Sequence, residues 1–83
     1  MRRLYGVTKE RNFKLEYYIV DDGKAYGIEI VKKYTEDGIE YCEKGVCSAI
    51  NPSQNRVQNI LETLLRNTVT PIGLAYVMED MAH

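Results

Sequence analysis

The two cysteines of the chain are the first residues whose type and spacing suggest chemistry. They lie in the stretch YCEKGVC, as Cys42 and Cys47. A shared zinc ion or a disulfide needs both sulfur atoms on one side of the backbone. Positions five apart on a strand point to opposite faces, because side chains alternate with period two. We therefore predict that Cys42 points outward, that Cys47 joins the apolar face, and that both are packing residues.

Gly45, which lies between the cysteines, leaves one alternative open. A bulge at this glycine would insert an extra residue into the strand and bring both thiols to one face. Even then, two cysteines and the histidine at the last position, His83, are too few for a four-ligand zinc site. No metal and no cofactor is expected.

General acid–base and nucleophilic catalysis need paired groups that a scaffold holds close together. The chain has one histidine, and its glycines are scattered, so no phosphate-binding loop is predicted. Glu79 and Asp80 are adjacent carboxylates, but neighbouring residues point in different directions around a helix. We predict a protein that is not an enzyme.

The strands that position these residues are predicted from alternating apolar runs and two Asp-Gly turns, Asp22-Gly23 and Asp37-Gly38. Asp-Gly favours a two-residue type I′ hairpin, since glycine accepts a positive φ at little cost. Such loops predict these cross-strand pairs: Ile19–Tyr26, Tyr17–Ile28 and Leu15–Ile30 at the first hairpin, and Tyr34–Tyr41, Lys32–Glu43 and Ile28–Cys47 at the second. All of these residues then share one mainly apolar face of a meander.

The period of the apolar residues changes to that of a helix after Ile50. Asn51-Pro52 predicts a helix start, with Asn51 as the N-cap and Pro52 at the first helical position. Thr70-Pro71 repeats this signature and predicts a second helix. Apolar residues recur at helical spacing in both segments: Val57, Ile60, Leu61, Leu64 and Leu65, then Leu74, Val77, Met78 and Met81.

The predicted fold is one small α+β domain over residues 1–83. It is an antiparallel β-meander of three to four strands, packed on one face by two C-terminal helices. We expect strands at about 3–8, 13–21, 24–35 and 39–50, and helices at about 52–67 and 71–81.

Composition excludes several classes of protein. The chain is 45% hydrophobic and 28% charged, which argues against a disordered chain. No apolar run approaches the roughly 18 residues that would cross a bilayer. The first residues, MRRLYGVTKER, have no apolar stretch behind their arginines, so no signal peptide is expected. We expect a cytoplasmic protein with reduced thiols.

The tyrosines are the leading candidates for a binding role. Tyr34 and Tyr41 face each other at the second hairpin, where the helices need not reach, and large rings give contact area at low entropic cost. The alternative is an aromatic cross-strand pair that only holds the hairpin together. Glu79 and Asp80 are further candidates for partner contacts. Homodimerisation through the C-terminal helix or an exposed edge strand is a further expectation for a domain of this size.

A basic segment near the N-terminus supports an alternative function, nucleic-acid binding. Its cationic residues are Arg2, Arg3, Lys9 and Arg11. They would attract phosphates, or they would simply neutralise the acidic strands that follow. The sequence pI of about 5.8 lies well below that of typical nucleic-acid-binding domains.

The pattern Tyr26-Gly27-Ile28-Glu29-Ile30, Ile50-Asn51-Pro52-Ser53, Val69-Thr70-Pro71 and Glu79-Asp80 resembles a family of short proteins of unknown function. The family comes from clostridia and related Firmicutes, and the resemblance covers roughly residues 17–81. It implies a bacterial cytoplasmic origin, and it implies no activity and no catalytic residues.

Overall fold

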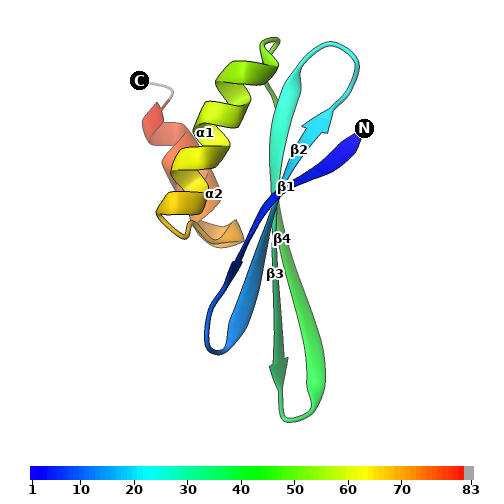
Figure 1. The fold of residues 1–83 in the computed structure, drawn as a ribbon, viewed down its shortest axis with the longest axis vertical. Helices are drawn as coiled ribbons and strands as arrows, with labels where there is room; N and C mark the ends of the chain where they lie inside the picture. The colour runs from blue at the N-terminus through cyan, green and yellow to red at the C-terminus, as the bar shows by residue number, and fades with distance from the viewer. Residues whose placement is uncertain (82–83) are drawn as a thin grey trace.

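The computed structural model describes residues 1–81 and has the α+β fold that the sequence predicts (Figure 1). Strands come first and helices last in the chain. The elements are β1 (Arg2–Lys9), β2 (Phe13–Asp21), β3 (Tyr26–Glu36), β4 (Ile39–Asn51), α1 (Gln54–Arg66) and α2 (Pro71–Met81). Each begins and ends within two residues of its predicted bounds. No helix in this part of the chain is long and apolar enough to span a membrane.

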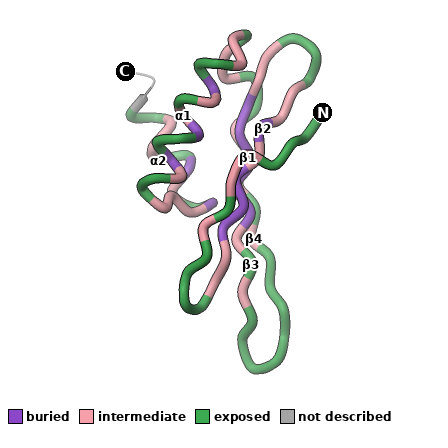
Figure 2. The backbone as a smooth tube through the Cα atoms, in the orientation of Figure 1, coloured by how far each residue is buried: buried purple, intermediate pink, exposed green. Residues whose placement is uncertain are grey.

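The four strands form one antiparallel sheet in sequence order, β1-β2-β3-β4, so β1 and β4 are its edges. Both helices lie on the same side of the sheet, and the opposite face is open (Figure 1). Buried residues gather where the sheet meets the helices, and both hairpin tips at the lower end are exposed (Figure 2). The core therefore occupies the part of the sheet that lies under the helices.

The second hairpin has the predicted register. Asp37 and Gly38 form a two-residue turn with φ of 53° and 78°, the positive values of a type I′ turn. Tyr34 pairs with Tyr41, and the ladder continues without interruption to Cys47.

The predicted register of the first hairpin is wrong by two residues. Asp21, not Ile19, lies opposite Tyr26, so the loop has four residues rather than two. Aspartate side chains stabilise the longer loop. Asp21 Oδ1 accepts a hydrogen bond from the Gly23 amide at 2.7 Å, and Asp22 Oδ1 accepts hydrogen bonds from the Lys24 and Ala25 amides, both at 2.9 Å. A shift of two residues leaves every side chain on its predicted face.

The start of α1 also differs from the prediction. Ser53, not Asn51, is the N-cap, and its hydroxyl accepts a hydrogen bond from the Arg56 amide at 3.4 Å. Asn51 still belongs to β4, and its side-chain oxygen accepts from the Ser53 amide at 2.8 Å, which turns the chain towards the helix. The predicted cap of α2 is confirmed, since Thr70 Oγ1 accepts from the Gly73 amide at 3.3 Å.

The core is one cluster between the helix-side face of the sheet and the two helices. Its buried members are Leu15, Tyr17, Ile19, Ile28, Ile30, Val57, Leu61, Leu64 and Leu74. Tyr17 is the only polar one among them, and its hydroxyl donates a hydrogen bond of 2.9 Å to the Val69 carbonyl between the helices. The polar end of this ring is therefore satisfied within an apolar core.

Candidate interaction surface

The β3–β4 hairpin extends beyond both helices and carries the predicted tyrosine pair (Figure 1). The rings of Tyr34 and Tyr41 are stacked, with centroids 5.2 Å apart and planes inclined by 15°. Tyr34 is half-buried, and Tyr41 keeps 41% of its surface exposed. This pair is therefore a ring stack with one accessible side, on a part of the sheet that no helix covers.

Two more residues extend this stack on the same face of the sheet. Phe13 of β2 pairs with Tyr34. Lys32 Nζ lies 4.9 Å from the centroid of the Phe13 ring and 5.3 Å from that of the Tyr34 ring. A cation over a ring face is attracted by its quadrupole, so the lysine is held above the rings. We call Phe13, Lys32, Tyr34 and Tyr41 the aromatic patch.

Sequence reasoning missed Phe13 because the predicted register of the first hairpin placed it two residues away from Tyr34. The signal lay in Asp21 and Asp22, two consecutive aspartates before a glycine. Their side chains can each accept backbone hydrogen bonds and so favour a longer loop.

Glu43 gives the aromatic patch a polar rim. The Tyr34 hydroxyl lies 3.5 Å from Glu43 Oε1. Burial, followed by the negative charge of Glu43, raises the pKa of Tyr34 above its ordinary value. The hydroxyl is therefore protonated at neutral pH, and the patch offers a hydrogen-bond donor, a cation and a carboxylate around its rings.

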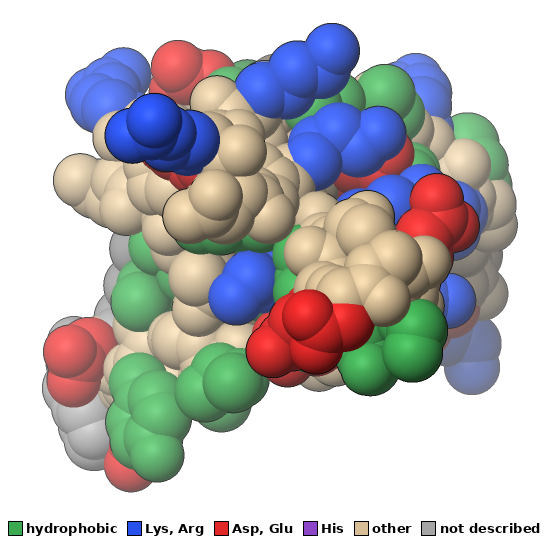
Figure 3. Space-filling model, turned by 90° about the horizontal axis from the view of Figure 1, so that it is seen from below, with side chains coloured by type: hydrophobic (Ala, Val, Ile, Leu, Met, Phe, Trp, Pro, Cys, Tyr) green, Lys and Arg blue, Asp and Glu red, His purple; other side chains and the backbone are tan. Residues whose placement is uncertain are grey.

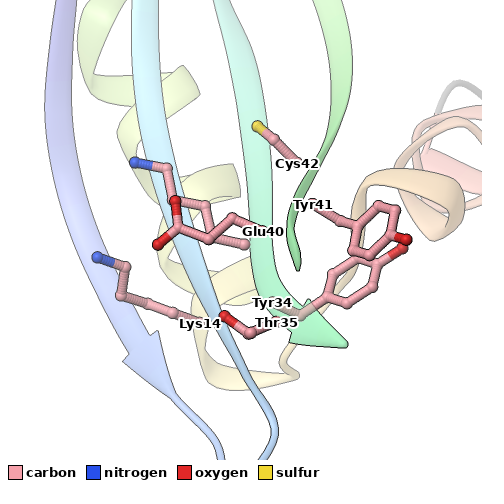
Figure 4. A pocket seen from close by; sticks show the side chains of 7 residues that line it. Lys14, Tyr34, Thr35, Glu40, Tyr41 and Cys42 are labelled. Carbon is pink, nitrogen blue, oxygen red and sulfur yellow. The ribbon is translucent and has the colours of Figure 1, made fainter. Parts of the chain in front are cut away.

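A depression of about 500 Å³ lies beside the same hairpin. Its walls include Lys14, Lys33, Glu40 and Cys42, which come from the open side of the sheet. Figure 4 shows Lys14, Glu40 and Cys42 pointing to one side of the hairpin and the stacked tyrosines to the other. The lysine ammonium groups already form ion pairs with Glu16, which weakens the depression as a site for an anion.

Glu16 is the centre of a polar network on the open face of the sheet. Only 8% of its surface is exposed, although no helix covers it. Its carboxylate accepts a 2.9 Å hydrogen bond from Tyr18 and lies 3.3 Å from Lys14 Nζ and 3.2 Å from Lys33 Nζ. Burial alone would raise the pKa of Glu16, but these three partners outweigh it and hold the pKa below its ordinary value. Long polar side chains thus cover the centre of this face.

The cysteines lie on opposite faces, as predicted. Cys42 is exposed and lies opposite Lys33, whereas Cys47 pairs with Ile28 and packs against the core. Gly45 pairs regularly with Ile30, so the bulge considered at this glycine does not occur. Over residues 1–81, no three His, Cys, Asp or Glu side chains come together as a metal site, and His83 lies outside the described residues.

The irregularity of β4 lies after Cys47 instead. Three residues, 48–50, lie between the partners of Tyr26 and Ile28, and Ala49 has a φ of 53°. Gly27 sits opposite this bulge, and a Cβ there would come within 2.5 Å of the Cys47 carbonyl oxygen. Glycine at this position therefore lets the bulged backbone approach β3.

The basic residues of the N-terminal segment do not form one patch. Arg2 forms an ion pair with Glu29, and its guanidinium carbon lies 3.6 Å from the centroid of the Tyr18 ring on the open face. Arg3 pairs with a residue of the helix-side face, Lys9 ends β1, and Arg11 lies in the following turn. The four charges are spread along one edge and over both faces of the sheet.

The acidic pair is also remote from the tyrosines. Glu79 and Asp80 are exposed near the end of α2, at the opposite end of the molecule from the β3–β4 hairpin tip (Figure 1). Of the predicted partner-binding residues, the structure brings only Tyr34 and Tyr41 together.

A second apolar surface lies along α2. Ile72 and Tyr76, four residues apart on one stripe of the helix, each keep 71% of their surface exposed. Hydrophobic side chains gather on the side of the molecule where α2 lies, at the lower left of Figure 3. A groove of about 300 Å³ separates this helix from β4, and its walls include Gly45, Pro71 and Met78. Sequence reasoning named this helix as a candidate dimer surface but missed Ile72 and Tyr76, because its predicted apolar stripe consisted of Leu74, Val77, Met78 and Met81.

The fold and these surfaces define a small α+β domain, an antiparallel β-meander with two helices on one face and apolar surface beyond their reach. The chain belongs to the family described as "Family of unknown function (DUF6514)", which matches residues 4–83. No curated protein and no solved structure matches this sequence.

Proposed function

We propose that the chain is a non-catalytic interaction or regulatory module that binds a protein partner, either a different protein or a second copy of itself. The observation that carries this proposal is the aromatic patch, where Tyr34 and Tyr41 stack on a hairpin that no helix covers. Tyrosine and phenylalanine are enriched in protein interfaces, because a rigid ring buries much area for little loss of rotamer freedom.

The residues around the aromatic patch support specific recognition of a protein partner in addition to burial of the rings. Lys32 lies over two rings and Glu43 lies beside the Tyr34 hydroxyl, so polar groups surround an apolar centre. Protein interfaces commonly have an apolar centre and a polar rim. A rim with charges of both signs fixes the orientation of a bound partner more than it adds to the binding affinity.

The setting that we propose is the bacterial cytoplasm. Its support is the sequence resemblance to short clostridial proteins, together with two cysteines that lie on opposite faces of the sheet as free thiols. Free thiols are typical of reducing compartments.

The test is an affinity pull-down from a bacterial lysate with a Tyr34→Ala/Tyr41→Ala double variant. We expect a partner that the wild type retains to be lost, because both rings of the stack are removed. Leu4→Ala is the control, since Leu4 is also an exposed apolar side chain but lies on β1, at the other edge of the sheet. Circular dichroism would check that each variant is folded. A partner retained equally by the double variant contradicts a role for the patch.

Nucleic-acid binding through Arg3, Lys9 and Arg11 is the alternative proposal. These residues are exposed and take part in none of the ion pairs found among residues 1–81, whereas Arg2 is paired with Glu29. Binding to mixed RNA and DNA would be measured at low salt, where electrostatic affinity is greatest. Absence of binding there rules this alternative out.

A further inference from the structure

The two edges of the sheet differ in their capacity to accept another strand. β1 has a bulge between Leu4 and Gly6, and its charged residues, Arg2, Arg3 and Lys9, are all basic. Bulges and like charges blunt an edge against pairing with a second copy. β4 pairs regularly from Ile39 to Cys47 and carries charges of both signs. The β4 edge is therefore the one suited to strand addition.

The turn of the second hairpin determines which backbone groups of β4 are free. A two-residue type I′ loop makes its flanking residues, Glu36 and Ile39, a hydrogen-bonded pair. Backbone groups then alternate along an antiparallel ladder. The amides and carbonyls of Glu40, Cys42 and Lys44 consequently point away from β3, towards the free edge.

We propose that two copies of the chain pair through β4 as antiparallel strands, with Cys42 of each copy facing the other on a two-fold axis. This inference rests on the proposed interaction role and names its partner as a second copy. The result is a continuous eight-stranded sheet with all four helices on one side. Strand addition at an exposed edge is a common recognition mode, and the two-fold dimer is the commonest homo-oligomer.

Charge complementarity supports this register. With Cys42 on the axis, Glu40 of each copy lies opposite Lys44 of the other, on the open face of the sheet. Neither residue takes part in the ion pairs found within residues 1–81. Centring the pair on Glu43 or on Lys44 would instead place like charges opposite each other.

An apolar contact supports the same register independently. Ile39 is 56% exposed and points to the helix-side face of β4. In the proposed dimer it lies opposite Gly45 of the second copy, beside the groove of about 300 Å³ that Pro71 and Met78 help to form. Each copy thus offers an exposed isoleucine to an apolar groove of the other.

The aromatic patch borders the same interface. Tyr41 lies opposite Glu43 of the second copy, so the exposed side of the ring stack faces the new strand. Helix α2 does not obstruct the pairing. Its first residue, Pro71, sits over Gly45, three positions from the axis, so the Pro71 residues of the two copies lie about 20 Å apart along the strands.

Charge reversal tests the register. In Glu40→Lys and in Lys44→Glu, both cross-strand pairs become like-charged, and we expect the dimer dissociation constant from analytical ultracentrifugation to rise about tenfold or more. An equimolar mixture of the two variants restores opposite charges at both pairs, so it should form a heterodimer with near wild-type affinity. Glu36→Lys is the matched control, because Glu36 lies on β3 and away from this edge.

Cys42 provides a second and independent readout. Facing residues of a hydrogen-bonded antiparallel pair have Cα atoms about 5.5 Å apart, a distance that a disulfide can span. Diamide would accept two electrons and two protons from the two thiols as the sulfur–sulfur bond forms. We expect Cys47→Ser to yield a covalent dimer, Cys42→Ser to yield none, and Glu40→Lys to slow cross-linking of the Cys47→Ser variant.

Three results would each overturn the proposed dimer: a wild type that is monomeric at high concentration, cross-linking through Cys47, or a variant mixture that fails to associate while both variants are folded. None of these results removes the proposed interaction function. The proposed interaction function is contradicted by a different result: no dimer forms, and the Tyr34→Ala/Tyr41→Ala variant retains the pull-down partner as well as the wild type does.

Discussion

Pro71 lies directly over Gly45, so that the first residue of α2 touches the backbone of β4. A Cβ at Gly45 would come within 2.6 Å of the Pro71 carbonyl oxygen and 3.0 Å of its Cα. Gly45 has no positive φ among the backbone torsions of the described residues, so its role is close approach rather than unusual geometry. This contact seats α2 on the sheet and sets the width of the groove beside β4.

Replacing Gly45 by alanine should therefore lift α2 from the sheet. We expect Gly45→Ala to lower the free energy of unfolding by about 1–3 kcal/mol, the usual cost of overpacking. Urea unfolding at fixed protein concentration measures the change. Gly73→Ala is the control inside α2, where the nearest atom lies 3.5 Å from the added Cβ. Alanine there should be neutral or stabilising by up to about 1 kcal/mol. An equal decrease in the free energy of unfolding in both variants would contradict the proposed role of the Gly45–Pro71 contact.

Tyr17 should make stability sensitive to alkaline pH. Burial raises its pKa from the ordinary value of 10 to about 12, because the core disfavours the phenolate. The folded state thus holds the proton more tightly than the unfolded chain. The stability from the neutral ring is full below pH 10 and is lost as the pH rises from 10 through about 12.

The difference in urea midpoint between wild type and Tyr17→Phe isolates this effect from other groups that titrate in the same range. At pH 7 the variant should lose about 1 kcal/mol, the worth of the hydrogen bond to Val69. Above pH 10 the wild type should lose stability more steeply than the variant. Parallel pH profiles would mean that Tyr17 is not the titrating group.

Glu16 should make the stability of the fold sensitive to acidic pH. Its pKa lies below the ordinary value of 4.5, so the native state favours the ionised carboxylate. The resulting stability is full above the ordinary pKa and disappears as the pH falls through the lower native value. Glu16→Gln should cost about 1 kcal/mol at pH 7, because charge-assisted hydrogen bonds are lost while Lys14 and Lys33 remain partly hydrated.

Thermal unfolding at pH 7 and at pH 3 checks this expectation. The gap in thermal midpoint between wild type and Glu16→Gln should narrow towards pH 3, since protonation of the wild-type carboxylate removes its charge-assisted hydrogen bonds as the pH falls through the lowered pKa. Glu40→Gln serves as the control, because Glu40 is exposed and forms none of the ion pairs among residues 1–81. A gap that stays constant with pH would show that the ionised network adds no stability.

The two hairpins show how far local sequence determines this fold. Asp37-Gly38 follows Glu36 rather than a second aspartate, no hydrogen bond joins Glu36 to a loop amide among residues 1–81, and the predicted register is correct over the ladder to Cys47. Asp22-Gly23 follows a second aspartate, and hydrogen bonds from loop amides to both carboxylates outweigh the preference for a two-residue turn. Because the error is two residues, the apolar face was still predicted correctly.

The candidate surfaces were less predictable than the fold. The Tyr34–Tyr41 stack follows from one turn and was predicted, whereas Phe13 depends on the register between two hairpins. The exposure of Ile72 and Tyr76 depends on how α2 rotates on the sheet, which the Pro71–Gly45 contact fixes. Such tertiary contacts leave no periodic signal in the sequence.

The loop of the first hairpin allows a direct test of the competition between a two-residue Asp-Gly turn and the four-residue loop that the aspartate side chains stabilise. Deleting Lys24 and Ala25 leaves Asp22-Gly23 as a two-residue loop between Asp21 and Tyr26, which keep their pairing. We expect the fold to persist, with cross-strand nuclear Overhauser contacts between Ile19 and Ile28, because Asp-Gly suits a type I′ turn.

Deleting Gly23 and Lys24 instead gives a control loop of the same length, Asp22-Ala25. Alanine would then need the positive φ that Gly23 adopts at 92°, which costs a non-glycine residue about 1–2 kcal/mol. Its thermal midpoint should therefore fall below that of the first deletion. If both deletions lose the same stability, the Asp22-Gly23 type I′ turn does not form; if Ile19 moves opposite Tyr26, the strand contacts alone do not hold the native register.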